Sequence, residues 1–418
     1  MWTNLPVAVT EALERLRGQG FSAFLVGGCV RDCLRGVTPQ DYDMTTSATP
    51  EETKAAFADK TVVETGIRHG TVTVFSHHIP LEITTFRRDG AYTDGRHPDG
   101  VSFATDVRED LSRRDFTVNA MAWSPWEGLV DLFGGREDLR AGVIRCVGEP
   151  SRRFREDALR ILRGVRFASR LDFAIEEQTA RAMRECTPLL AQVSRERICD
   201  EFVRLLQGQG VEKVLAEFST VVDFLMPELP PCTRETARLV ASVPPVPALR
   251  LAAFFYGRAD AHRAEKVLTG LRMEKKLIRT VSVLLAESAS LVLPMEDATA
   301  LRLLQRVSAE TAELLLTLSE GIASVMDSSC ISIEQVAKAK EQLRRLLASS
   351  PCLSVSELAI KGSDLLALGC PPGETVGKLL RTLLEEVTEG KLTNDPASLT
   401  NRAEKILEEP AHTVLESD

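Results

Sequence analysis

The sequence predicts an α+β protein in which an N-terminal head with a mixed β-sheet is followed by a long region made of helices. Over the first 145 residues, short β-rich runs alternate with helical stretches. From about residue 152 onward, apolar residues recur at helical spacing instead. At 418 residues the chain is too long for one hydrophobic core, so we expect several domains.

The head is predicted to begin with an amphipathic helix within residues 1–20, where apolar residues are spaced at helical intervals. Strands are expected wherever β-branched and aromatic residues gather between turn residues. The runs that meet this description are FLVGG (24–28), VTVF (72–75), LEITTF (81–86) and VSFAT (101–105).

The rest of the chain is predicted to be helical. The clearest helical runs are residues 158–171, 199–207, 211–218 and 248–257. Proline-rich breaks at 226–232 and 243–247 are typical of sub-domain boundaries. We therefore predict a head (1–145), a neck (146–210), a body (211–325) and a tail (326–418).

Composition and charge limit the cellular compartment and the binding partners that we expect for the protein. The nine cysteines are scattered, which favours a reducing cytoplasm and argues against a structural zinc site. With no secretion signal and no apolar run of membrane-spanning length, we expect a cytoplasmic protein without a membrane partner. The net charge of −9 argues against a nucleic-acid partner, but residues 152–170 hold seven arginines against Glu156 and Asp157. This local excess is either a solvated helix face or a binding surface.

A strand that runs into Gly27 and Gly28, followed by a helix with Arg31, forms the first candidate site. Glycines let the backbone approach a phosphate closely, and a helix N-terminus offers free N–H groups. Arg31, one turn into the helix, would reach the same phosphate with its forked donors. The same pattern also occurs as a simple packing turn.

Asp41 and Asp43 form the second candidate site. Residues two apart on a strand point to one face, so both carboxylates would share a site. Two adjacent carboxylates repel each other unless a cation lies between them, and Mg²⁺ with substrate phosphates satisfies this requirement. An isolated Asp-x-Asp is more often a surface turn.

The two motifs together resemble the nucleotidyltransferases related to DNA polymerase β. Further segments resemble class II tRNA nucleotidyltransferases, the family of bacterial CCA-adding enzymes and poly(A) polymerases, and they occur in that family's order. They are ETGIRHGTVTVF (64–75), LEITTFR (81–87), YTDGRHPDGVSF (92–103), DLSRRDFTVNAMAW (110–123), DLFGGREDL (131–139) and REDALRILRGVRFASRLDF (155–173). The resemblance is close over residues 20–210 and looser in the tail, at residues 358–380.

This resemblance implies an enzyme with a polymerase-β-like head that adds C, C and A to the 3′ end of tRNA from CTP and ATP. It implies that Asp41 and Asp43 bind two Mg²⁺ ions, and it leaves Glu82 and Asp115 as candidates for a third carboxylate. Gly28 and Arg31 match the triphosphate-binding turn, and Arg114 matches a nucleotide-binding position. We expect Arg113 to form a surface ion pair, and we infer no obligatory protein partner.

The segment at 155–173 resembles the motif by which these enzymes recognise the incoming base. Asp157 and Arg160 are three residues apart, so on a helix they would project from one face. A carboxylate accepts from the exocyclic amine of cytosine or adenine, and a guanidinium donates to the neighbouring ring nitrogen. Uracil and guanine present an oxygen in place of that amine and would be rejected. Arg163 and Arg166 continue the same face and are predicted to bind phosphate.

Three alternatives remain open. Residues 86–100 are predicted to form a mobile loop, which the family associates with the step from C to A addition. This loop disfavours a CC-only enzyme but leaves an A-adding enzyme possible. A poly(A) polymerase is disfavoured by the short acidic C-terminus, and a catalytically inactive tRNA-binding protein by the intact Asp41 and Asp43.

A glycine- and proline-rich segment in the tail, GCPPGETVGKLL (369–380), lacks the phosphate-loop pattern. It is predicted to be a turn that opens a helix, near the tRNA backbone.

Overall fold

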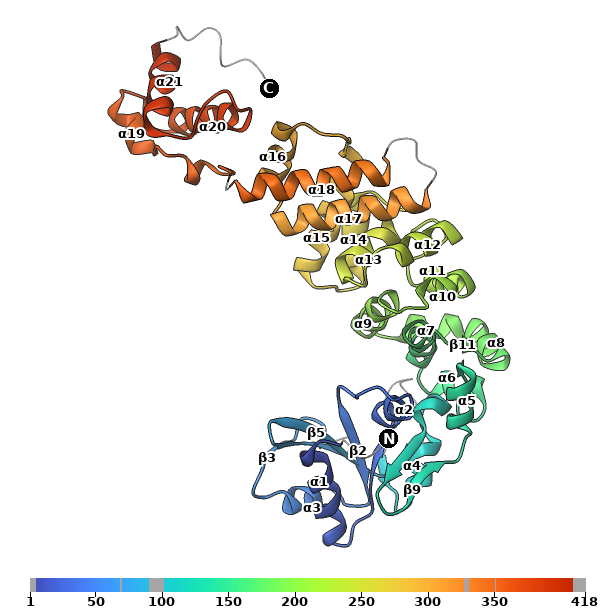
Figure 1. The fold of residues 1–418 in the computed structure, drawn as a ribbon. Coiled ribbons are helices and arrows are strands. Elements are labelled where there is room, and N and C mark those ends of the chain that lie inside the picture. Colours follow the sequence, from blue (N-terminus) through green and yellow to red (C-terminus); the bar gives the residue numbers. More distant parts are fainter. Residues whose placement is uncertain (1–4, 68–69, 90–100, 327–330, 350, 409–418) are drawn as a thin grey trace. The chain divides into compact units, whose positions relative to one another are not determined.

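The computed structural model of the chain describes residues 5–67, 70–89, 101–326, 331–349 and 351–408. The chain divides into two compact units (Figure 1). The first comprises Met1–Ala241, Pro245–Leu251 and Lys266–Glu274, and the second comprises Ser242–Pro244, Ala252–Glu265 and Lys275–Asp418. Part of this division coincides with the proline-rich break at 243–247, whereas the four predicted domain boundaries remain predictions.

The first unit begins with a β-sheet that has seven strands among the described residues, in the spatial order β3-β4-β5-β2-β1-β8-β9. The strands are β1 (Ala23–Val26), β2 (Tyr42–Thr46), β3 (Thr61–Val63), β4 (Thr71–Ser76), β5 (Ile79–Thr85), β8 (Met121–Ser124) and β9 (Gly128–Asp131). β2 and β5 pair in parallel, and the other neighbours pair antiparallel. The predicted mixed sheet is therefore confirmed. The run at 101–105 does not join it, because β7 (Val101–Phe103) pairs with β6 (Arg87–Asp89) in a separate two-stranded sheet.

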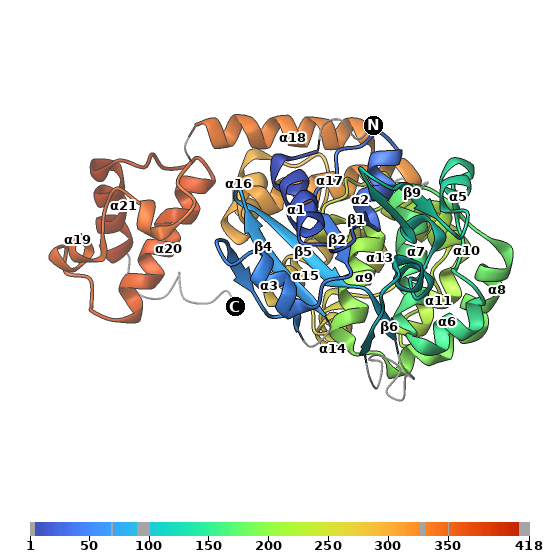
Figure 2. The same cartoon turned by 90° about the horizontal axis from the view of Figure 1, so that it is seen from below.

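Two helices, α1 (Val7–Gly18) and α3 (Pro50–Ala56), cover one face of the sheet (Figures 1 and 2). Their apolar residues share a core with Leu25, Tyr42 and Met44. Successive strand residues point to opposite faces, so Phe24 contributes to a second core that includes residues of α4 (Val107–Ser112). The same alternation directs Asp43 away from α1 and α3.

The predicted helical region is confirmed with one exception. Its helices in the first unit and at the unit boundary are α6 (Pro150–Glu156), α7 (Leu159–Leu171), α8 (Glu177–Cys186), α9 (Arg195–Leu206), α10 (Val211–Glu217), α11 (Ser219–Leu225), α12 (Arg234–Ser242), α13 (Pro247–Phe255) and α14 (Ala261–Gly270). The exception is β11 (Ala174–Ile175), which pairs in parallel with β10 (Val143–Ile144). The chain turns into this strand because Asp172 adopts the left-handed conformation, with a φ of 55°, and ends α7.

Short helices complete the head. They are α2 (Gly28–Leu34), α5 (Gly135–Ala141) and the 3₁₀ turn η2 (Thr117–Asn119). The predicted first amphipathic helix corresponds to α1, which buries Val9, Leu13 and Leu16. The apolar spacing of residues 1–20 therefore placed this helix correctly.

The second unit contains the remaining helices, which are α15 (Lys275–Ser290), α16 (Asp297–Arg306), α17 (Ala309–Val325), α18 (Ile333–Ala348), α19 (Gly362–Ala367), α20 (Glu374–Thr388) and α21 (Pro396–Glu408). The last three share a core around Leu365, Leu383 and Leu399. Gly373, with a φ of 107°, precedes α20, which confirms the predicted turn that opens a helix. In the described parts of the chain, no helix is both long and apolar enough to span a bilayer.

Candidate active site

Two carboxylates lie side by side on the face of the sheet opposite α1 and α3. Asp43 on β2 is in register with Glu82 on the parallel strand β5, and both residues are exposed. Asp41 lies in a bend one residue before β2, so only Asp43 of the predicted pair is on the strand itself. Desolvation and the negative charges of Glu82 and Asp41 raise the pKa of Asp43, while Arg114 opposes the rise. Asp43 therefore lies in an environment with excess negative charge.

These carboxylates are suited to Mg²⁺ because they are hard oxygen ligands whose mutual repulsion a divalent cation would relieve. No three histidine, cysteine or acidic side chains among the described residues are close enough to form a ready-made metal cage. Asp41, Asp43 and Glu82 are the residues that would hold the ion.

Gly27 and Gly28 make room for two guanidinium groups. Gly27 has a φ of +74°, and a Cβ built on it would lie 3.1 Å from Arg114 Nη1. A Cβ on Gly28 would lie 3.6 Å from Arg31 Nη2. The glycine pair thus admits arginine side chains next to the backbone at the start of α2, whereas the sequence alone suggested only an approach to phosphate.

The side chain of Arg31 is buried rather than free to bind a phosphate. Arg31 is 3% exposed, its Nη1 donates to Asn119 Oδ1 at 2.7 Å, and its Nε donates to Asp32 Oδ1 at 2.9 Å. Its guanidinium also lies 5.6 Å from the centre of the Phe167 ring. In this structure the buried guanidinium of Arg31 therefore connects α2 to η2 and α7.

Arg114, in contrast, keeps unused donor capacity next to the carboxylates. Its Nη2 donates to Asp110 Oδ2 at 3.1 Å, while its buried Nε has no hydrogen-bond partner in the described structure. Arg113 binds the other oxygen of Asp110 at 2.7 Å. Burial raises the pKa of Asp110, but the two arginines outweigh this effect and hold that pKa below its usual value. Arg113 does form an ion pair, but its partner Asp110 is fully buried, so the pair is not the expected surface one.

The contacts of Asp115 separate it from the other candidate for the third carboxylate. Asp115 accepts from Arg163 Nε at 2.8 Å and from the backbone N–H of Phe116 at 2.8 Å. Burial alone would raise its pKa, but the charge and hydrogen bond of Arg163 lower it. Asp115 is thus committed to α7, whereas Glu82 is the neighbour of Asp43.

The sequence analysis expected Asp157 and Arg160 on one helix, but in the structure Asp157 lies outside the helix that contains Arg160. Its backbone is extended, with φ and ψ of −146° and 105°, and it separates α6 from α7. The chain breaks here because Asp157 Oδ1 accepts from the N–H of Leu159, two residues ahead, in an Asx-type turn. Asp157 Oδ2 accepts from Arg197 Nη2 at 2.8 Å.

Arg160 is held by contacts of its own. Its Nη1 donates to Glu156 Oε2 at 2.8 Å, and its Nη2 donates to the backbone carbonyl of Arg113 at 3.1 Å. Burial would raise the pKa of Glu156, but hydrogen bonds and charges from Arg153 and Arg160 keep it low. The backbone contact ties the start of α7 to the segment that carries Arg114.

Arg163 and Arg166, which the sequence predicts to bind phosphate, both have acidic partners in this structure. Arg163 Nη2 lies 2.7 Å from Asp115, and the buried Arg166 binds Glu201 of α9. Both guanidinium groups also flank Phe167, at 5.4 Å and 4.1 Å from the ring centre. The fold supplies acidic partners for these arginines, so their positive charges join segments of the protein.

The sequence analysis missed Arg197 and Glu201. They are four residues apart on α9, so they face the same neighbour. Arg197 binds Asp157 and Glu201 binds Arg166. The signal was present in the sequence as a spaced charge pair on an amphipathic helix, but its partners lie about 35 to 40 residues away. Of the predicted loop at 86–100, residues 90–100 lie outside the described residues, and residues 87–89 form the strand β6.

Comparison with known proteins identifies the family of this chain. The model of the "Poly A polymerase head domain" family matches residues 23–145. A tRNA nucleotidyltransferase domain model matches residues 250–403, and the "Probable RNA and SrmB- binding site of polymerase A" model matches residues 172–231. The CCA-adding enzyme of Enterococcus faecalis is 37% identical over 96% of this chain and 97% of its own length. The chain belongs to the CCA-adding enzyme family.

Other members of this family support the assignment over the whole chain. The CCA-adding enzyme of Limosilactobacillus fermentum is 35% identical over 94% of this chain and 96% of its own length. A structure of the Bacillus stearothermophilus CCA-adding enzyme in complex with CTP has 30% identity and a TM-score of 0.81, and the match covers 96% of this chain and 97% of that one. The predicted fold class and membership of the tRNA nucleotidyltransferase family are therefore confirmed.

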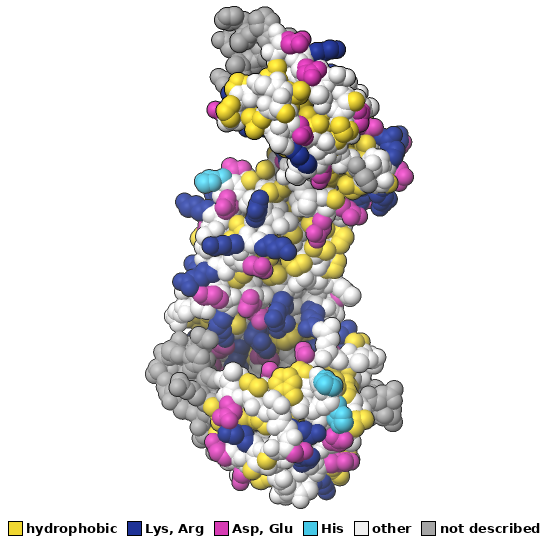
Figure 3. Space-filling model, turned by 90° about the vertical axis from the view of Figure 1, so that its left-hand side faces the viewer, with side chains coloured by type: hydrophobic (Ala, Val, Ile, Leu, Met, Phe, Trp, Pro, Cys, Tyr) yellow, Lys and Arg dark blue, Asp and Glu magenta, His cyan; other side chains and the backbone are white. Residues whose placement is uncertain are grey.

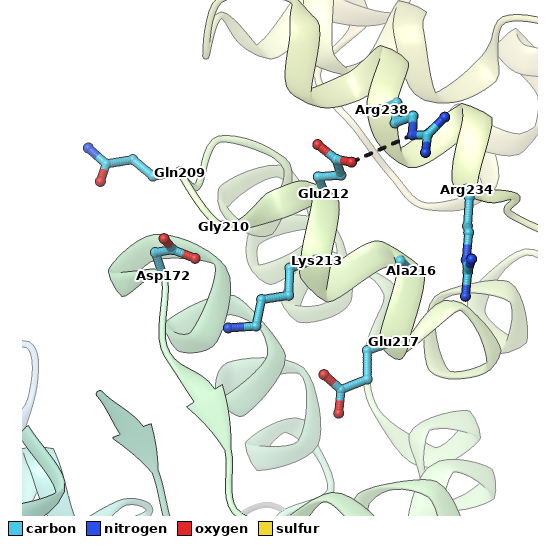
Figure 4. A pocket seen from close by; sticks show the side chains of 9 residues that line it. All are labelled: Asp172, Gln209, Gly210, Glu212, Lys213, Ala216, Glu217, Arg234 and Arg238. Atoms are coloured by element: carbon cyan, nitrogen blue, oxygen red, sulfur yellow. Dashed lines mark ion pairs between the residues drawn. The ribbon is translucent and has the colours of Figure 1, made fainter. Parts of the chain in front are cut away.

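The described part of this CCA-adding family member includes a charged hollow and a separate pocket of different character. Figure 3 shows Lys and Arg side chains, with some acidic ones, in a hollow just above the head. A separate pocket of about 650 Å³ is lined by Asp172, residues of α10 such as Lys213, and residues of α12 such as Arg234 (Figure 4). Three basic and three acidic side chains line this pocket, so its charges balance. It contains none of the predicted site residues.

Proposed function

We propose that this chain adds C, C and A to the 3′ end of tRNA without a nucleic-acid template, consuming CTP and ATP and releasing pyrophosphate. The observation that carries the proposal is the register of Asp43 with Glu82 on neighbouring parallel strands, with Arg114 beside them. Membership of the CCA-adding enzyme family supports the choice of tRNA as substrate.

We assign the catalytic carboxylates to Asp41, Asp43 and Glu82, and we leave Asp115 out of the metal site. When bound, Mg²⁺ would lower the pKa of the RNA 3′-hydroxyl and neutralise charge on the pyrophosphate leaving group. Arg114 is assigned to the nucleotide because its donor capacity is incompletely used next to Asp43. Gly28 permits close approach of the backbone at the start of α2.

Base selection is assigned to Asp157 and Arg160. An ionised carboxylate accepts only, so it pairs with the amine of cytosine or adenine and leaves uracil and guanine with facing acceptors. Arg160 supplies the donor for the neighbouring ring nitrogen. Each side chain is anchored by protein contacts before a nucleotide arrives, Asp157 by Arg197 and Arg160 by Glu156.

We propose the division of labour that the four predicted domains imply. The head (1–145) performs transfer, the neck (146–210) selects the base, and the body (211–325) and tail (326–418) bind tRNA. The tail segment 358–380 is the proposed contact with the tRNA backbone. It contains α19 and the turn that opens α20.

The test uses three tRNAs, which lack the whole CCA end, the final two nucleotides CA, or only the terminal A. Each is incubated with labelled CTP or with labelled ATP. Full CCA addition predicts incorporation of CTP into the first two and of ATP into the third. Incorporation of ATP into the third tRNA without any incorporation of CTP into the first two would identify an A-adding enzyme. Long adenylate tracts on unrelated RNA would identify a poly(A) polymerase, and no incorporation at all an inactive tRNA-binding protein.

A further inference from the structure

Helix α9 presents two opposite charges to the region of α7. Arg197 and Glu201 lie one turn apart on the same side of α9. Arg197 Nη2 donates to Asp157 Oδ2 at 2.8 Å, and Glu201 binds Arg166 and lies 3.9 Å from Arg163 Nη1. The pattern of charges on α9 is therefore complementary to that of the segment from Asp157 to Arg166.

The two ion pairs differ in burial, which separates their roles. The Arg166 and Glu201 side chains are 6% and 8% exposed, so this pair belongs to the packed contact between α7 and α9. The Arg197 and Asp157 side chains are 24% and 16% exposed, so this pair lies nearer the surface. Arg197 therefore lies outside the most buried part of this contact, where it donates to the Asp157 carboxylate.

Both oxygens of Asp157 have a protein donor. The Leu159 N–H binds Oδ1 at 3.0 Å, and Arg197 binds Oδ2 at 2.8 Å. A carboxylate has about four lone-pair sites, so two such bonds fix its plane and leave acceptor capacity for a base. We propose that Arg197 is a positioning residue that determines base specificity by fixing the orientation of the Asp157 carboxylate. This inference rests on the proposed role of Asp157 in reading the base.

The physical reason concerns the rejection of uracil. A fixed acceptor opposite the uracil O4 leaves two acceptors facing each other with no donor between them. A carboxylate held by the Leu159 N–H alone can turn away, and a water molecule can then bridge the two oxygens. Loss of Arg197 would thus ease the entry of UTP and GTP more than it would weaken binding of CTP and ATP.

The test measures kcat/KM for CTP and UTP on tRNA that lacks CCA, with the full-length protein. Arg197→Ala is expected to lower the CTP-over-UTP ratio about tenfold, the lower part of the range for one good base contact. Arg197→Lys should restore most of the ratio because it returns a cationic donor. Arg195→Ala removes an exposed arginine from the same helix and should leave the ratio unchanged.

A double variant shows whether Arg197 acts through Asp157. In the Asp157→Ala background, Arg197→Ala should change the ratio by less than about twofold, since the group it orients is gone. If Arg197→Ala instead lowers kcat/KM equally for all four triphosphates, or adds its full effect to Asp157→Ala, Arg197 is only a packing residue. Thermal unfolding of each variant checks that the protein is folded, and Arg197→Met, which also removes the donor but keeps a long side chain, replaces the alanine variant if that variant does not fold.

The two proposals fail in different ways. If Asp157→Ala leaves the CTP-over-UTP ratio unchanged, the base-reading assignment is wrong and the inference about Arg197 fails with it. If Asp157→Ala lowers the ratio but Arg197→Ala does not, the base-reading assignment stands and only the inference about Arg197 is overturned.

Discussion

The carboxylates Asp43 and Glu82 on the sheet of the head and the arginines of the neck both concentrate charge, but among the described residues ion pairs are found for several of the arginines and for neither of these carboxylates. In the head, Asp43 and Glu82 lie in register on one face of the sheet, and their mutual repulsion helps to raise the pKa of Asp43. In the neck, the buried Arg166 has Glu201 as its partner, and Arg163 pairs with Asp115 of the head. We therefore propose that a cation completes the site at Asp43 and Glu82, whereas Arg163 and Arg166 already have acidic partners in the fold.

This difference teaches how to interpret a charge-rich segment. From the sequence, the seven arginines of residues 152–170 form either a solvated helix face or a binding surface, but in the structure several of them pair with acidic side chains. Asp41, Asp43 and Glu82 of the head are exposed, and no ion pair is found for them among the described residues. Function is thus better indicated by charge that the fold leaves unbalanced than by the number of charged residues.

The largest effect is expected from removing the unbalanced charge of the head. Asp43→Ala or Asp41→Ala should abolish incorporation of both CTP and ATP and leave tRNA affinity nearly unchanged, because the metal acts only on the reacting groups. Single-turnover incorporation and tRNA binding measure the two effects. Substantial CTP incorporation by either variant would place the metal site elsewhere.

The stability of Asp43→Asn provides a control for this interpretation. Because the folded protein raises the pKa of Asp43 above 3.8, the ionised carboxylate disfavours folding at neutral pH. The asparagine variant should therefore be at least as stable as the parent protein near pH 7. The difference should disappear when the pH falls below the unfolded-state pKa, because Asp43 is then protonated in both the folded and the unfolded state.

The next largest effect is expected from removing one partner of the buried ion pair between Arg166 and Glu201. Glu201→Ala should lower the free energy of unfolding by about 3–5 kcal/mol, because it leaves the buried Arg166 without its acidic partner. Denaturant unfolding measures this loss. Replacing both residues together, as Arg166→Met with Glu201→Leu, should recover much of it. A loss below about 1 kcal/mol for the single variant would mean that solvent or another group compensates Arg166.

Local patterns predicted the elements of the fold well. The alternation of apolar residues placed β1, β4 and β5, and helical spacing placed α7 within one residue. The break at Asp157 could not be predicted in this way, because apolar periodicity says nothing about a carboxylate that binds a backbone N–H two residues ahead. The same applies to β11, which depends on pairing with a strand about 30 residues earlier.

The candidate site was predictable in its residue types and less so in its partners. The sequence proposed Asp41, Asp43, Arg114, Asp157 and Arg160, but it could not choose between Glu82 and Asp115. That choice depends on strand register and on Arg163, whose pairing spans 48 residues. Arg31, Arg163 and Arg166 were expected at phosphates because a sequence shows a charge without the distant group that neutralises it.

An intermediate effect on base selection is expected from replacing Asp157, the residue proposed to recognise the base. Asp157→Ala should raise UTP misincorporation relative to CTP by about one to two orders of magnitude, since one good base contact contributes about 1–3 kcal/mol of discrimination. The head carboxylates remain in place, so transfer itself should persist. Relative kcat/KM for the four triphosphates on tRNA lacking CCA measures the change, and replacement of Arg160 should also reduce discrimination. An unchanged preference for C over U in Asp157→Ala would remove the base-reading assignment.

The smallest effect is expected from Arg152, which tests whether burial, and not the number of arginines, separates the two regions. Its side chain is 77% exposed and pairs with Glu156 at 3.3 Å, which Arg153 and Arg160 also bind. Arg152→Ala should change the free energy of unfolding by no more than about 0.5 kcal/mol, as is usual for an accessible site. The CTP-over-UTP ratio should also stay constant, because Arg153 and Arg160 still hold Glu156. A destabilisation comparable to that of Glu201→Ala, or a change in base preference, would show that exposed arginines belong to the same balanced network and that burial is the wrong criterion.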